Sequence, residues 1–364
     1  MKRIKIHLDK RLSESHEICI GYDFQDRIGL LIAKEHPATR YVIITDSNVS
    51  QLYGKAFLQK LRELGLPVEL LEFPAGEGSK TMDTALALTA RLLELGVDRH
   101  SLLLALGGGV VGDLTGFVAS IYMRSVPCIQ IPTTLMAQVD SSIGGKTAVN
   151  LPQGKNLLGT FYQPKRIFTD LKFLETLSDD EYLNGVAEIV KYGVIDEPGF
   201  FELLENEVPA ILNRNQEMLE KVIEQSCRIK KGVVEIDEHE SGFRRILNYG
   251  HTLGHALEAA SNFTLAHGKA VALGMIAASG ISVQSGFLAP EERDRIENLT
   301  RNLGLPVRLP EGISKSTVLE RLQMDKKKEG NDLPFVLLKK IGIPFISKGV
   351  EKSMLEKVLG EMGP

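Results

Sequence analysis

The stretch "LLLALGGGVVGDLTGF" at residues 102–117 joins a short apolar run to a helix-like segment through three consecutive glycines. The apolar run predicts a strand that is buried on both faces of a sheet. Without side chains, Gly107, Gly108 and Gly109 would let backbone N–H groups approach a phosphate, and a helix starting near residues 110–113 would add its positive end. The alternative is a structural turn, because the stretch lacks the Lys-Ser/Thr end of a Walker loop.

Strand-like and helical segments alternate on both sides of this stretch, and such alternation predicts a parallel sheet with crossover helices. The run "YVIITD" at residues 41–46 ends in Asp46, whose carboxylate could bind a ribose hydroxyl or cap the next helix. The other strand-like runs are "PVELLEFPAG" (67–76) and "PCIQIPTT" (127–134), and the helical ones are "SQLYGKAFLQKLRELG" (50–65) and "TMDTALALTARLLELG" (81–96).

The character of the chain changes after residue 177, because helix-period segments dominate and "PFVLLKKIG" at residues 334–342 is the one strand-like run. We therefore predict an α/β, Rossmann-like nucleotide-binding domain over residues 1–177. A mainly α-helical metal- and substrate-binding domain is predicted over residues 178–364. Sheets of this class bind ligands at the carboxyl ends of their strands, so a ligand site between the two domains is expected.

The overall composition excludes several classes of protein. A net charge of −4 provides no general attraction to nucleic acid or membranes, so an anionic ligand would need a local basic cluster. Cys19, Cys128 and Cys227 are scattered, which argues against a disulfide framework and against a thiolate metal site. The start of the chain lacks a signal-peptide core, and no apolar run approaches the ~20 residues that span a bilayer. We expect a reduced, soluble, cytoplasmic protein.

Residues 132–164, "PTTLMAQVDSSIGGKTAVNLPQGKNLLGTFYQP", form a dense polar block that we interpret as a long loop. Loops this long and polar inside a compact domain are usually functional. Lys146 and Lys155, set among glycines and hydroxyl groups, suit anionic groups such as phosphate or carboxylate. The alternative is an ordinary surface loop with solvated lysines.

The stretch "RRILNYGHTLGHALE" at residues 244–258 has helical character and places His251 and His255 on one helix face. Glu188 lies on an otherwise apolar helix, where a carboxylate calls for partners because burying charge alone is costly. One glutamate with two histidines is a known catalytic zinc set. The candidates are Glu188 with two of His251, His255 and His267, and these residues alone do not decide which two. Helix histidines without a metal ion are the alternative.

The chain also offers a set of basic side chains that could bind an anion. The set comprises Lys146, Lys155, Lys191, Lys230, Arg244 and the run "MDKKKEG" (324–330), although such a run is commonly a solvated face. Together with the glycines and histidines, these residues indicate a site for a nucleotide, a metal ion and a small substrate with several negative charges.

The chain resembles the 3-dehydroquinate synthase family, within the sugar phosphate cyclase superfamily, in eight motifs that keep the family's order from about residue 40 to about residue 340. The motifs are "GEGSK" (76–80), "GGGVVGDLTGFVA" (107–119), "PTTLMAQVDSSIGGKTAVN" (132–150), "GKNLLGTFYQP" (154–164), "GVAEIVKYG" (185–193), "RRILNYGHTLGHALE" (244–258), "HGKAVALGM" (267–275) and "DKKKEG" (325–330). One fragment would be weak support, whereas eight in order are very specific. The fold that the resemblance implies is the dehydroquinate synthase-like one.

The resemblance implies roles for individual residues. Glu188, His251 and His267 are similar to the family's ligands for one divalent metal ion, Zn²⁺ or Co²⁺, while His255 resembles a substrate-side histidine near the phosphate. The residues similar to the family's NAD⁺-binding set are Asp46, Glu77, Lys80, Gly108, Gly109, Gly112, Asp113, Thr133, Thr134, Lys146, Lys155 and Thr176.

The resemblance also implies a substrate-binding set. It consists of Arg124, Lys146, Lys155, Asn156, Lys191, Lys230, Arg244, Asn248, His255 and one lysine of Lys326 and Lys327. Within it, the residues implied to be catalytic are Lys146, Lys191, Arg244, Asn248 and His255. Arg124 matches an arginine that family dimers lend to the neighbouring active site, which implies a homodimer. The family more often has glycine where this chain has Ser125.

The activity that the resemblance implies is conversion of 3-deoxy-D-arabino-heptulosonate 7-phosphate to 3-dehydroquinate and phosphate, in the shikimate pathway to aromatic amino acids. The metal ion would acidify a hydroxyl and ease hydride transfer to NAD⁺, and phosphate would then leave by β-elimination. Return of the hydride, ring opening and an internal aldol closure would follow. Because NAD⁺ is regenerated, the enzyme would be a phosphorus–oxygen lyase.

Three other interpretations of the sequence are possible. A related sugar-phosphate cyclase would act on a substrate without the carboxylate, although Arg244, Lys230 and Asn248 argue for a carboxylate. A metal- and NAD-dependent polyol dehydrogenase would share the fold. A non-catalytic nucleotide-binding protein would require the histidine–glutamate set to be structural.

Overall fold

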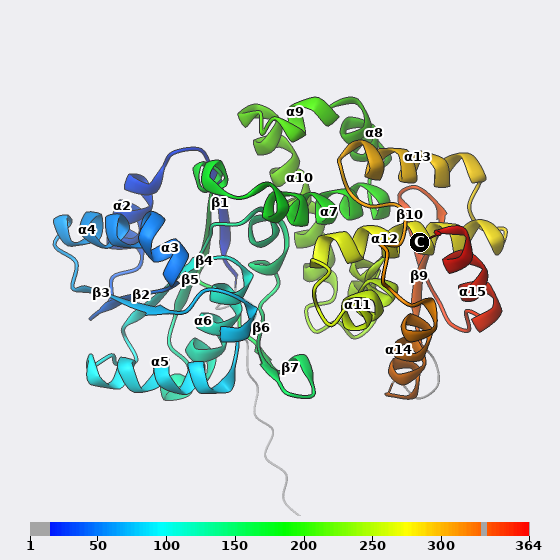
Figure 1. Cartoon of the computed structure of the whole chain (residues 1–364). Helices are drawn as coiled ribbons and strands as arrows, with labels where there is room; N and C mark the ends of the chain where they lie inside the picture. The colour runs from blue at the N-terminus through cyan, green and yellow to red at the C-terminus, as the bar shows by residue number, and fades with distance from the viewer. Residues whose placement is uncertain (1–14, 329–332, 364) are drawn as a thin grey trace, which may run out of the picture. The chain divides into compact units, whose positions relative to one another are not determined.

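The computed structural model describes residues 15–328 and 333–363, without the side chains of residues 325–328 (Figure 1). The chain divides into two compact units, the first ending at Glu175 and the second beginning at Thr176. The first unit is built from alternating strands and helices, and helices dominate the second. The predicted fold class, an α/β part followed by a mainly helical part, is therefore confirmed.

The described residues of the first unit contain one six-stranded sheet, whose paired strands all run parallel. The strand order is β1-β8-β5-β4-β2-β3. The strands are β1 (Glu17–Gly21), β2 (Tyr41–Asp46), β3 (Val68–Phe73), β4 (Leu102–Gly107), β5 (Cys128–Pro132) and β8 (Arg166–Asp170). The parallel sheet expected from the alternation is thus present, and β1 and β8 are strands that the sequence pattern did not reveal.

Both faces of this sheet are covered, as the apolar strands predicted. Leu103 of β4 belongs to one buried core and its neighbour Leu104 to another, because successive side chains of a strand point to opposite faces. Helices α5 (Met82–Glu94) and α6 (Gly109–Ile121) contribute to the first core, and α2 (Gln25–Glu35) and α4 (Lys55–Glu63) contribute to the second. Figure 1 shows these helices on the two sides of the strands.

The glycine stretch lies where β4 turns into α6. The helix begins at Gly109, one residue before the predicted start, and Gly108 is its N-cap. A Cβ atom on Gly107 would lie 2.4 Å from Cγ2 of Val111, so the strand can turn this tightly against its own helix only with glycine there. The backbone N–H groups at the start of α6 have no intrahelical partner, which is the arrangement that favours an anion.

The interpretation of residues 132–164 as a long loop was wrong. This segment contains one turn of π-helix (η4, Ala137–Ser141) and an antiparallel pair, β6 (Lys146–Leu151) and β7 (Gly154–Phe161). Thr147 and Val149 of β6 are buried, and the Thr147 hydroxyl lies 2.8 Å from that of Thr160 across the pair. The sequence did not reveal these strands, because the buried residues of β6 (Thr147, Ala148 and Val149) are consecutive and so show no alternation, and because two of them are polar or small.

The second unit is mainly helical. Its helices are α7 (Asp179–Ile195), α8 (Pro198–Asn206), α9 (Val208–Leu212), α10 (Gln216–Ile236), the 3-10 turn η6 (Phe243–Asn248), α11 (His251–Ala260), α12 (His267–Gln284), α13 (Pro290–Asn302), α14 (Lys315–Lys328) and α15 (Lys352–Glu361). The predicted strand near residues 334–342 is β9 (Phe335–Lys340), and it pairs with β10 (Ile343–Ser347), which was not predicted. None of the helices within residues 15–328 and 333–363 combines the length and apolar character needed to cross a membrane.

Residues 244–258 do not form one helix. The turn η6 ends at Asn248, and α11 starts at His251 after Gly250, whose φ is +78°. A left-handed residue interrupts helical hydrogen bonding, and glycine adopts this conformation without a Cβ clash. The segment is therefore two short elements with a change of direction just before His251.

Candidate functional site

Three side chains of the second unit meet in one place: Glu188 from α7, His251 from α11 and His267 from α12. Atom Nε2 of His251 and atom Nε2 of His267 each lie 3.4 Å from Oε1 of Glu188. Ligands placed tetrahedrally at about 2.1 Å from a zinc ion are themselves about 3.4 Å apart. The spacing of these three atoms therefore suits one metal ion with an open position.

Both histidines occupy the first position of their helices, and a close contact between α11 and α12 places them there. A Cβ atom on Gly274 would lie only 1.8 Å from the carbonyl oxygen of Gly250. A Cβ atom on Gly250 would in turn lie 2.8 Å from the carbonyl oxygen of Val271. The two glycines thus let α12 pack directly against the start of α11, which fixes the distance between the imidazoles.

Asn184, which the sequence analysis did not single out, fixes the start of α12 against α7. Its Oδ1 accepts a 2.8 Å hydrogen bond from the backbone N–H of Gly268, one of the donors that a helix start leaves free. Asn184 precedes Glu188 by four residues and so lies on the same face of α7. One helix face therefore holds both a ligand candidate and the cap of the helix that carries His267.

The carboxylate of Glu188 is buried and ionised, as is typical of a metal ligand. Its side chain is fully buried, and neither oxygen accepts a hydrogen bond from the described residues. The ammonium of Lys191 forms an ion pair with Oε2. Burial alone would raise the pKa of Glu188, but Lys191 and the adjacent imidazoles hold that pKa well below its usual value. An ionised, buried carboxylate with free lone pairs fits a divalent cation.

The outer nitrogens of both imidazoles have acceptors. Nδ1 of His251 lies 3.1 Å from the carbonyl oxygen of Tyr249, and a carbonyl can only accept, so Nδ1 carries the proton. Nδ1 of His267 lies 3.3 Å from Oε2 of Glu258, a buried carboxylate of α11. Burial would lower the pKa of His267, but the two carboxylates Glu188 and Glu258 outweigh it and raise that pKa to about 10. The two carboxylates thus favour the protonated His267 ring, and a metal ion held beside Glu188 would take the place of the proton on Nε2.

His255 is exposed and does not join the set of Glu188, His251 and His267. Its ring centroid lies 5.5 Å from that of His251 and 6.2 Å from that of His267. The geometry therefore places His251 beside Glu188 and leaves His255 exposed, while the metal-binding and substrate-binding roles implied for them remain predictions.

Three of the predicted substrate contacts are buried cations on elements that pack together. Lys191 lies on α7, Lys230 on α10 and Arg244 on η6, and each is at most 5% exposed. Burying three cations is costly unless anionic groups or hydrogen bonds compensate. Lys191 is compensated by Glu188, and Arg244 donates to the carbonyl of Glu238, so these cations are held in place by groups of the second unit.

Arg244 is positioned by the turn between α10 and η6. Asp237 accepts hydrogen bonds from the backbone N–H groups of Ser241, Gly242 and Arg244, at 2.8 to 3.0 Å. These N–H donors, that of Arg244 foremost, hold the pKa of Asp237 well below its ordinary value although burial opposes them. The guanidinium of Arg244 also donates to the carbonyl of Glu238. Asp237 was not predicted, although an aspartate directly after a helix is a common turn signal.

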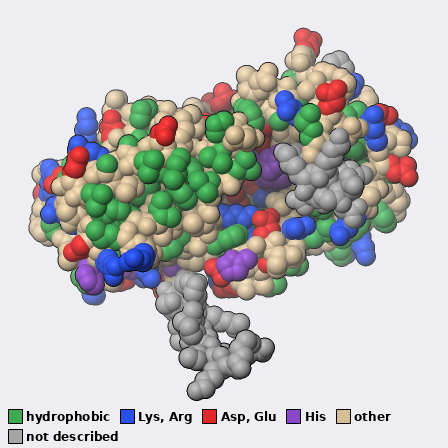
Figure 2. Space-filling view, turned by 90° about the horizontal axis from the view of Figure 1, so that it is seen from below, with side chains coloured by type: hydrophobic (Ala, Val, Ile, Leu, Met, Phe, Trp, Pro, Cys, Tyr) green, Lys and Arg blue, Asp and Glu red, His purple; other side chains and the backbone are tan. Residues whose placement is uncertain are grey.

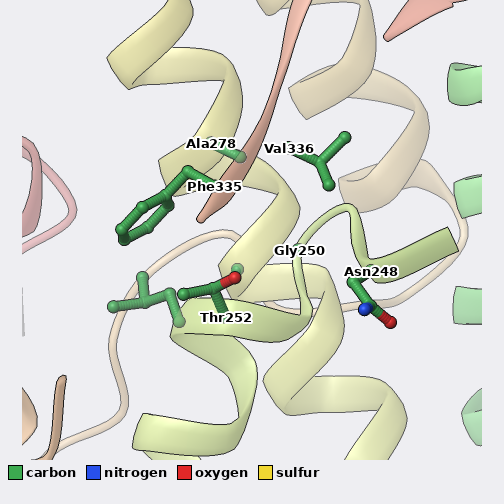
Figure 3. Close-up of a pocket in the computed structure, with 8 residues that line it drawn as sticks. Asn248, Gly250, Thr252, Ala278, Phe335 and Val336 are labelled. Atoms are coloured by element: carbon green, nitrogen blue, oxygen red, sulfur yellow. The ribbon is translucent and has the colours of Figure 1, made fainter. Parts of the chain in front are cut away.

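Asn248 lies at the edge of a small pocket lined by α11, α12 and β9 (Figure 3). Its amide donates a 2.9 Å hydrogen bond to Oε1 of Glu240, and in the close-up it points away from Phe335 and Val336. Thr252, on the first turn of α11, donates to the carbonyl of Pro334 just before β9. These contacts fix the chain on both sides of His251.

In the first unit, the structure brings several predicted cofactor residues together. The Lys80 ammonium lies 2.5 Å from both Oδ2 of Asp113 and Oδ1 of Asn156. Asn156 was predicted to bind substrate, and here it is joined to the cofactor candidates. Asn150, which was not predicted, links the same group, because its amide donates to Glu77 and its Oδ1 accepts from the N–H of Asn156.

The other cofactor candidates lie around the carboxyl ends of the parallel strands. Gly108 lies against Thr134, and Gly109 lies against Ser141. A Cβ atom added to Gly108 would come within 3.0 Å of Thr134, and one added to Gly109 within 3.1 Å of Ser141. Gly112 packs against Gln130, and the backbone N–H of Thr133 bonds to the Gly107 carbonyl. Asp46 caps helix α3 (Ser47–Val49) through the N–H groups of Asn48 and Val49, so the capping alternative is realised with Oδ1.

The remaining predicted residues lie on several elements. Lys146 and Lys155 lie on β6 and β7, and Thr176 is an exposed residue at the end of the turn η5 (Leu171–Thr176). Arg124 is exposed directly after α6. The side chains of Lys326 and Lys327 lie outside the described residues, so their predicted role remains a prediction.

Comparison with known proteins identifies the family of the chain. The model of the 3-dehydroquinate synthase N-terminal part matches residues 70–184, and that of the C-terminal part matches residues 185–328. The chain belongs to the 3-dehydroquinate synthase family. A 3-dehydroquinate synthase of Desulforamulus reducens is 44% identical over 362 residues, covering 99% of this chain and 100% of the relative.

Two solved structures of sugar-phosphate cyclases resemble this member of the 3-dehydroquinate synthase family. ValA, a 2-epi-5-epi-valiolone synthase from Streptomyces hygroscopicus with NAD⁺ and Zn²⁺ bound, has a TM-score of 0.90 and 28% identity, covering 99% of both chains. A 2-deoxy-scyllo-inosose synthase complexed with carbaglucose-6-phosphate, NAD⁺ and Co²⁺ has a TM-score of 0.87 and 28% identity, covering 94% of this chain and 96% of the other. The described fold is therefore that of the cyclases.

Proposed function

We propose that this chain is a 3-dehydroquinate synthase, a phosphorus–oxygen lyase that converts 3-deoxy-D-arabino-heptulosonate 7-phosphate to 3-dehydroquinate and phosphate. The observation that carries this proposal is the convergence of Glu188, His251 and His267, whose ligand atoms lie within 4.8 Å of one another, inside a chain that belongs to this family. The same residues suit zinc or cobalt, since nitrogen and oxygen donors serve both ions.

Glu188, His251 and His267 would hold the metal ion, and the residues around Lys80 and Asp113 would hold NAD⁺ with the start of α6. When bound, these groups supply acidification of the substrate hydroxyls and a temporary acceptor for two electrons. The side chains of the protein would bind and orient the substrate and neutralise its negative charge. Lys191, beside Glu188, would keep that carboxylate ionised and bind an oxygen of the substrate.

The buried cations Lys230 and Arg244 favour a substrate that carries a carboxylate. Arg244 has a planar guanidinium that can bind a carboxylate through two parallel hydrogen bonds, and Asp237 fixes its backbone. His255 is exposed next to the metal candidates, where it could exchange a proton with a substrate oxygen. These assignments predict that the substrate's carboxylate is required for efficient turnover.

The decisive experiment follows phosphate and NADH together. The purified chain, loaded with Zn²⁺ or Co²⁺ and NAD⁺, should release phosphate from 3-deoxy-D-arabino-heptulosonate 7-phosphate with no net increase in absorbance at the NADH band. Removal of the metal ion with a chelator should abolish release, and added metal should restore it. Net NADH formation from a polyol, without phosphate release, would replace the proposal by a dehydrogenase.

The substrate itself separates this proposal from a related cyclase. Sedoheptulose 7-phosphate lacks the carboxylate, so Arg244 and Lys230 would be left without their expected partner, and turnover should be much slower. Arg244→Gln should reduce the difference in turnover between the two substrates, because the variant loses affinity only for the substrate that carries the carboxylate. Efficient turnover of sedoheptulose 7-phosphate alone would contradict the assignment.

We also propose a homodimer that is formed through the first unit. Large apolar side chains are exposed on neighbouring segments: Ile121 at the end of α6, Met123 after it and Phe161 at the end of β7. The hydroxyls of Ser120 and Thr160 lie 2.8 Å apart, which places these segments side by side. Figure 2 shows hydrophobic side chains gathered on one face of the first unit. Exposed apolar patches of this kind commonly mark an interface.

Two measurements test the homodimer. Phe161→Asp should shift the mass in sedimentation from dimer toward monomer, whereas Leu52→Asp, at an exposed leucine of another segment, should not. If Arg124 acts in the neighbouring subunit, then mixed dimers of Arg124→Ala and His251→Ala chains should recover activity that neither variant has alone. Inactive mixed dimers would show that Arg124 serves its own chain.

A further inference from the structure

His267 lies between two carboxylates, and the mechanism uses only one of them. Its Nε2 faces Glu188, and its Nδ1 lies 3.3 Å from Oε2 of Glu258. Glu258 is on the last turns of α11, its side chain is 7% exposed, and no role in substrate or metal binding has been assigned to it. A buried carboxylate needs compensation, and the imidazole N–H provides it.

We infer that Glu258 is a positioning residue for the metal centre: it holds the proton of His267 on Nδ1 and thereby turns Nε2 toward the metal ion. Ligating histidines almost always donate their second N–H to a carboxylate or a carbonyl, which fixes the tautomer and makes the ligand more basic. His251 uses the carbonyl of Tyr249 in this way. The two histidines would therefore differ, since only His267 is backed by a charged acceptor.

The backbone of Glu258 strengthens this assignment. Its carbonyl accepts hydrogen bonds from the N–H of Phe263 at 2.7 Å and from the hydroxyl of Ser261 at 2.8 Å. The Ser261 hydroxyl accepts in turn from the N–H of Leu265, two residues before His267. Glu258 thus fixes the short link from α11 to α12 through its main chain and the imidazole through its side chain. His267 is constrained at both its backbone and its ring.

A second cation site made of His255, Glu258 and His267 is the competing explanation, since their ligand atoms also lie within 4.8 Å of one another. It would require Nδ1 of His267 to lose its proton while Nε2 binds the first ion. His255, which belongs only to the second group, is exposed. The three ligand candidates of the first group are buried or partly buried. The geometry therefore favours a hydrogen bond from His267 to Glu258 over a bridged pair of ions.

This inference rests on the proposed metal centre, and its test measures metal binding in addition to activity. Glu258→Leu removes the acceptor and should weaken Zn²⁺ binding by about 10- to 100-fold in chelator competition. Glu258→Gln keeps an oxygen acceptor without the charge, so its loss of Zn²⁺ affinity should be smaller. The visible spectrum of the Co²⁺-loaded protein should shift in both variants, because the ligand field of His267 changes. Glu235→Leu, at an exposed glutamate of α10, is the matched control.

The possible results are distinguishable. Wild-type affinity and an unchanged Co²⁺ spectrum in both Glu258 variants would overturn the inference and leave the metal centre intact. Two equivalents of metal in the wild type, with one lost in Glu258→Leu, would replace it by the second cation site. A wild type that binds no stoichiometric metal would overturn both proposals. The metal-free variants should keep the circular dichroism spectrum of the wild type, which separates positioning from misfolding.

Discussion

His251 and His255 differ in surroundings although both project from α11. His251 is 12% exposed in its side chain and lies beside Glu188, whereas His255 is exposed. His251→Ala should therefore lose the metal ion and activity together. His255→Ala should keep the metal ion and lose turnover by roughly 10² to 10⁴-fold, the usual contribution of a general acid or base. Mass spectrometry measures the metal content of the two variants, and phosphate release measures their activity. Loss of the metal ion from His255→Ala would show that His255 is a metal ligand.

At the residue scale, the resemblance named Glu188, His251 and His267, which the structure brings together, but the sequence did not show what orients them. The spacing of His251 and His255 suggested a shared helix face, and it could not show that the chain turns at Gly250 just before them. Asn184 and Glu258 carry no sequence signal of their own, because their partners, Gly268 and His267, are distant in the chain or on another helix. Only the packing of α7, α11 and α12 reveals them.

Asp237 is expected to make the turn before Arg244 sensitive to acid. Its folded pKa is depressed, so its contribution to stability is complete above its unfolded pKa of about 4 and is lost as the pH falls below that value. Asp237→Asn should reduce the free energy of unfolding at pH 7, and the difference from wild type should shrink toward pH 3. Urea titrations at several pH values measure both. Equal stability of the two proteins at pH 7 would contradict this.

At the scale of elements, the contact between α11 and α12 is the tightest constraint on the metal set. Gly274→Ala would place a Cβ atom 1.8 Å from the Gly250 carbonyl oxygen and should destabilise the protein by about 1–3 kcal/mol or more. Gly280→Ala on the same helix is the control, because its Cβ would make an ordinary 3.4 Å contact with Val358. Since alanine favours helices over glycine, that variant should gain up to about 1 kcal/mol. Urea unfolding measures the free energy of unfolding of both variants, and equal values for the two would contradict the prediction.

The end of α6 stores backbone strain. Met123, Arg124 and Ser125 all have positive φ, and Ser125 has φ +99° and ψ +129°, a region that glycine tolerates and other residues avoid. Ser125→Gly should raise the free energy of unfolding by about 1 kcal/mol, the strain relieved less the extra entropy of glycine in the unfolded chain. Ser125→Ala, which removes the hydroxyl without relieving the strain, should not. Thermal unfolding compares them, and a lower unfolding temperature for Ser125→Gly would disprove the strain.

The helices were predictable from their apolar period, and the central strands from short continuous apolar runs, as in residues 102–107 and 41–46. The β6–β7 pair was not, since its buried positions include Thr147 and Ala148, whose polarity and size resemble those of a loop. β1 and β8 were missed for a different reason. They lie at and near one edge of the sheet, where partners far apart in the chain decide pairing and local pattern does not.

At the scale of the whole molecule, the candidate ligands of the metal ion and of NAD⁺ fall in different compact units. Glu188, His251 and His267 belong to the second unit, and Lys80 with Asp113 to the first. Each ligand binds the native form and so stabilises the elements that hold it, by about 2.7 kcal/mol at a concentration 100 times its dissociation constant. The two effects should therefore be local and separable.

Hydrogen exchange followed by mass spectrometry tests this separation. Zn²⁺ alone should slow exchange at the Glu188 region of α7 and at the first turns of α11 and α12, while leaving the start of α6 unchanged. NAD⁺ alone should slow exchange at residues 107–113 and near Lys80, where the glycine stretch and the ammonium would contact it. His251→Ala is the control, because it should lose the Zn²⁺ effect and keep that of NAD⁺. If NAD⁺ left residues 107–113 unprotected, then the glycines would serve only the turn from β4 to α6.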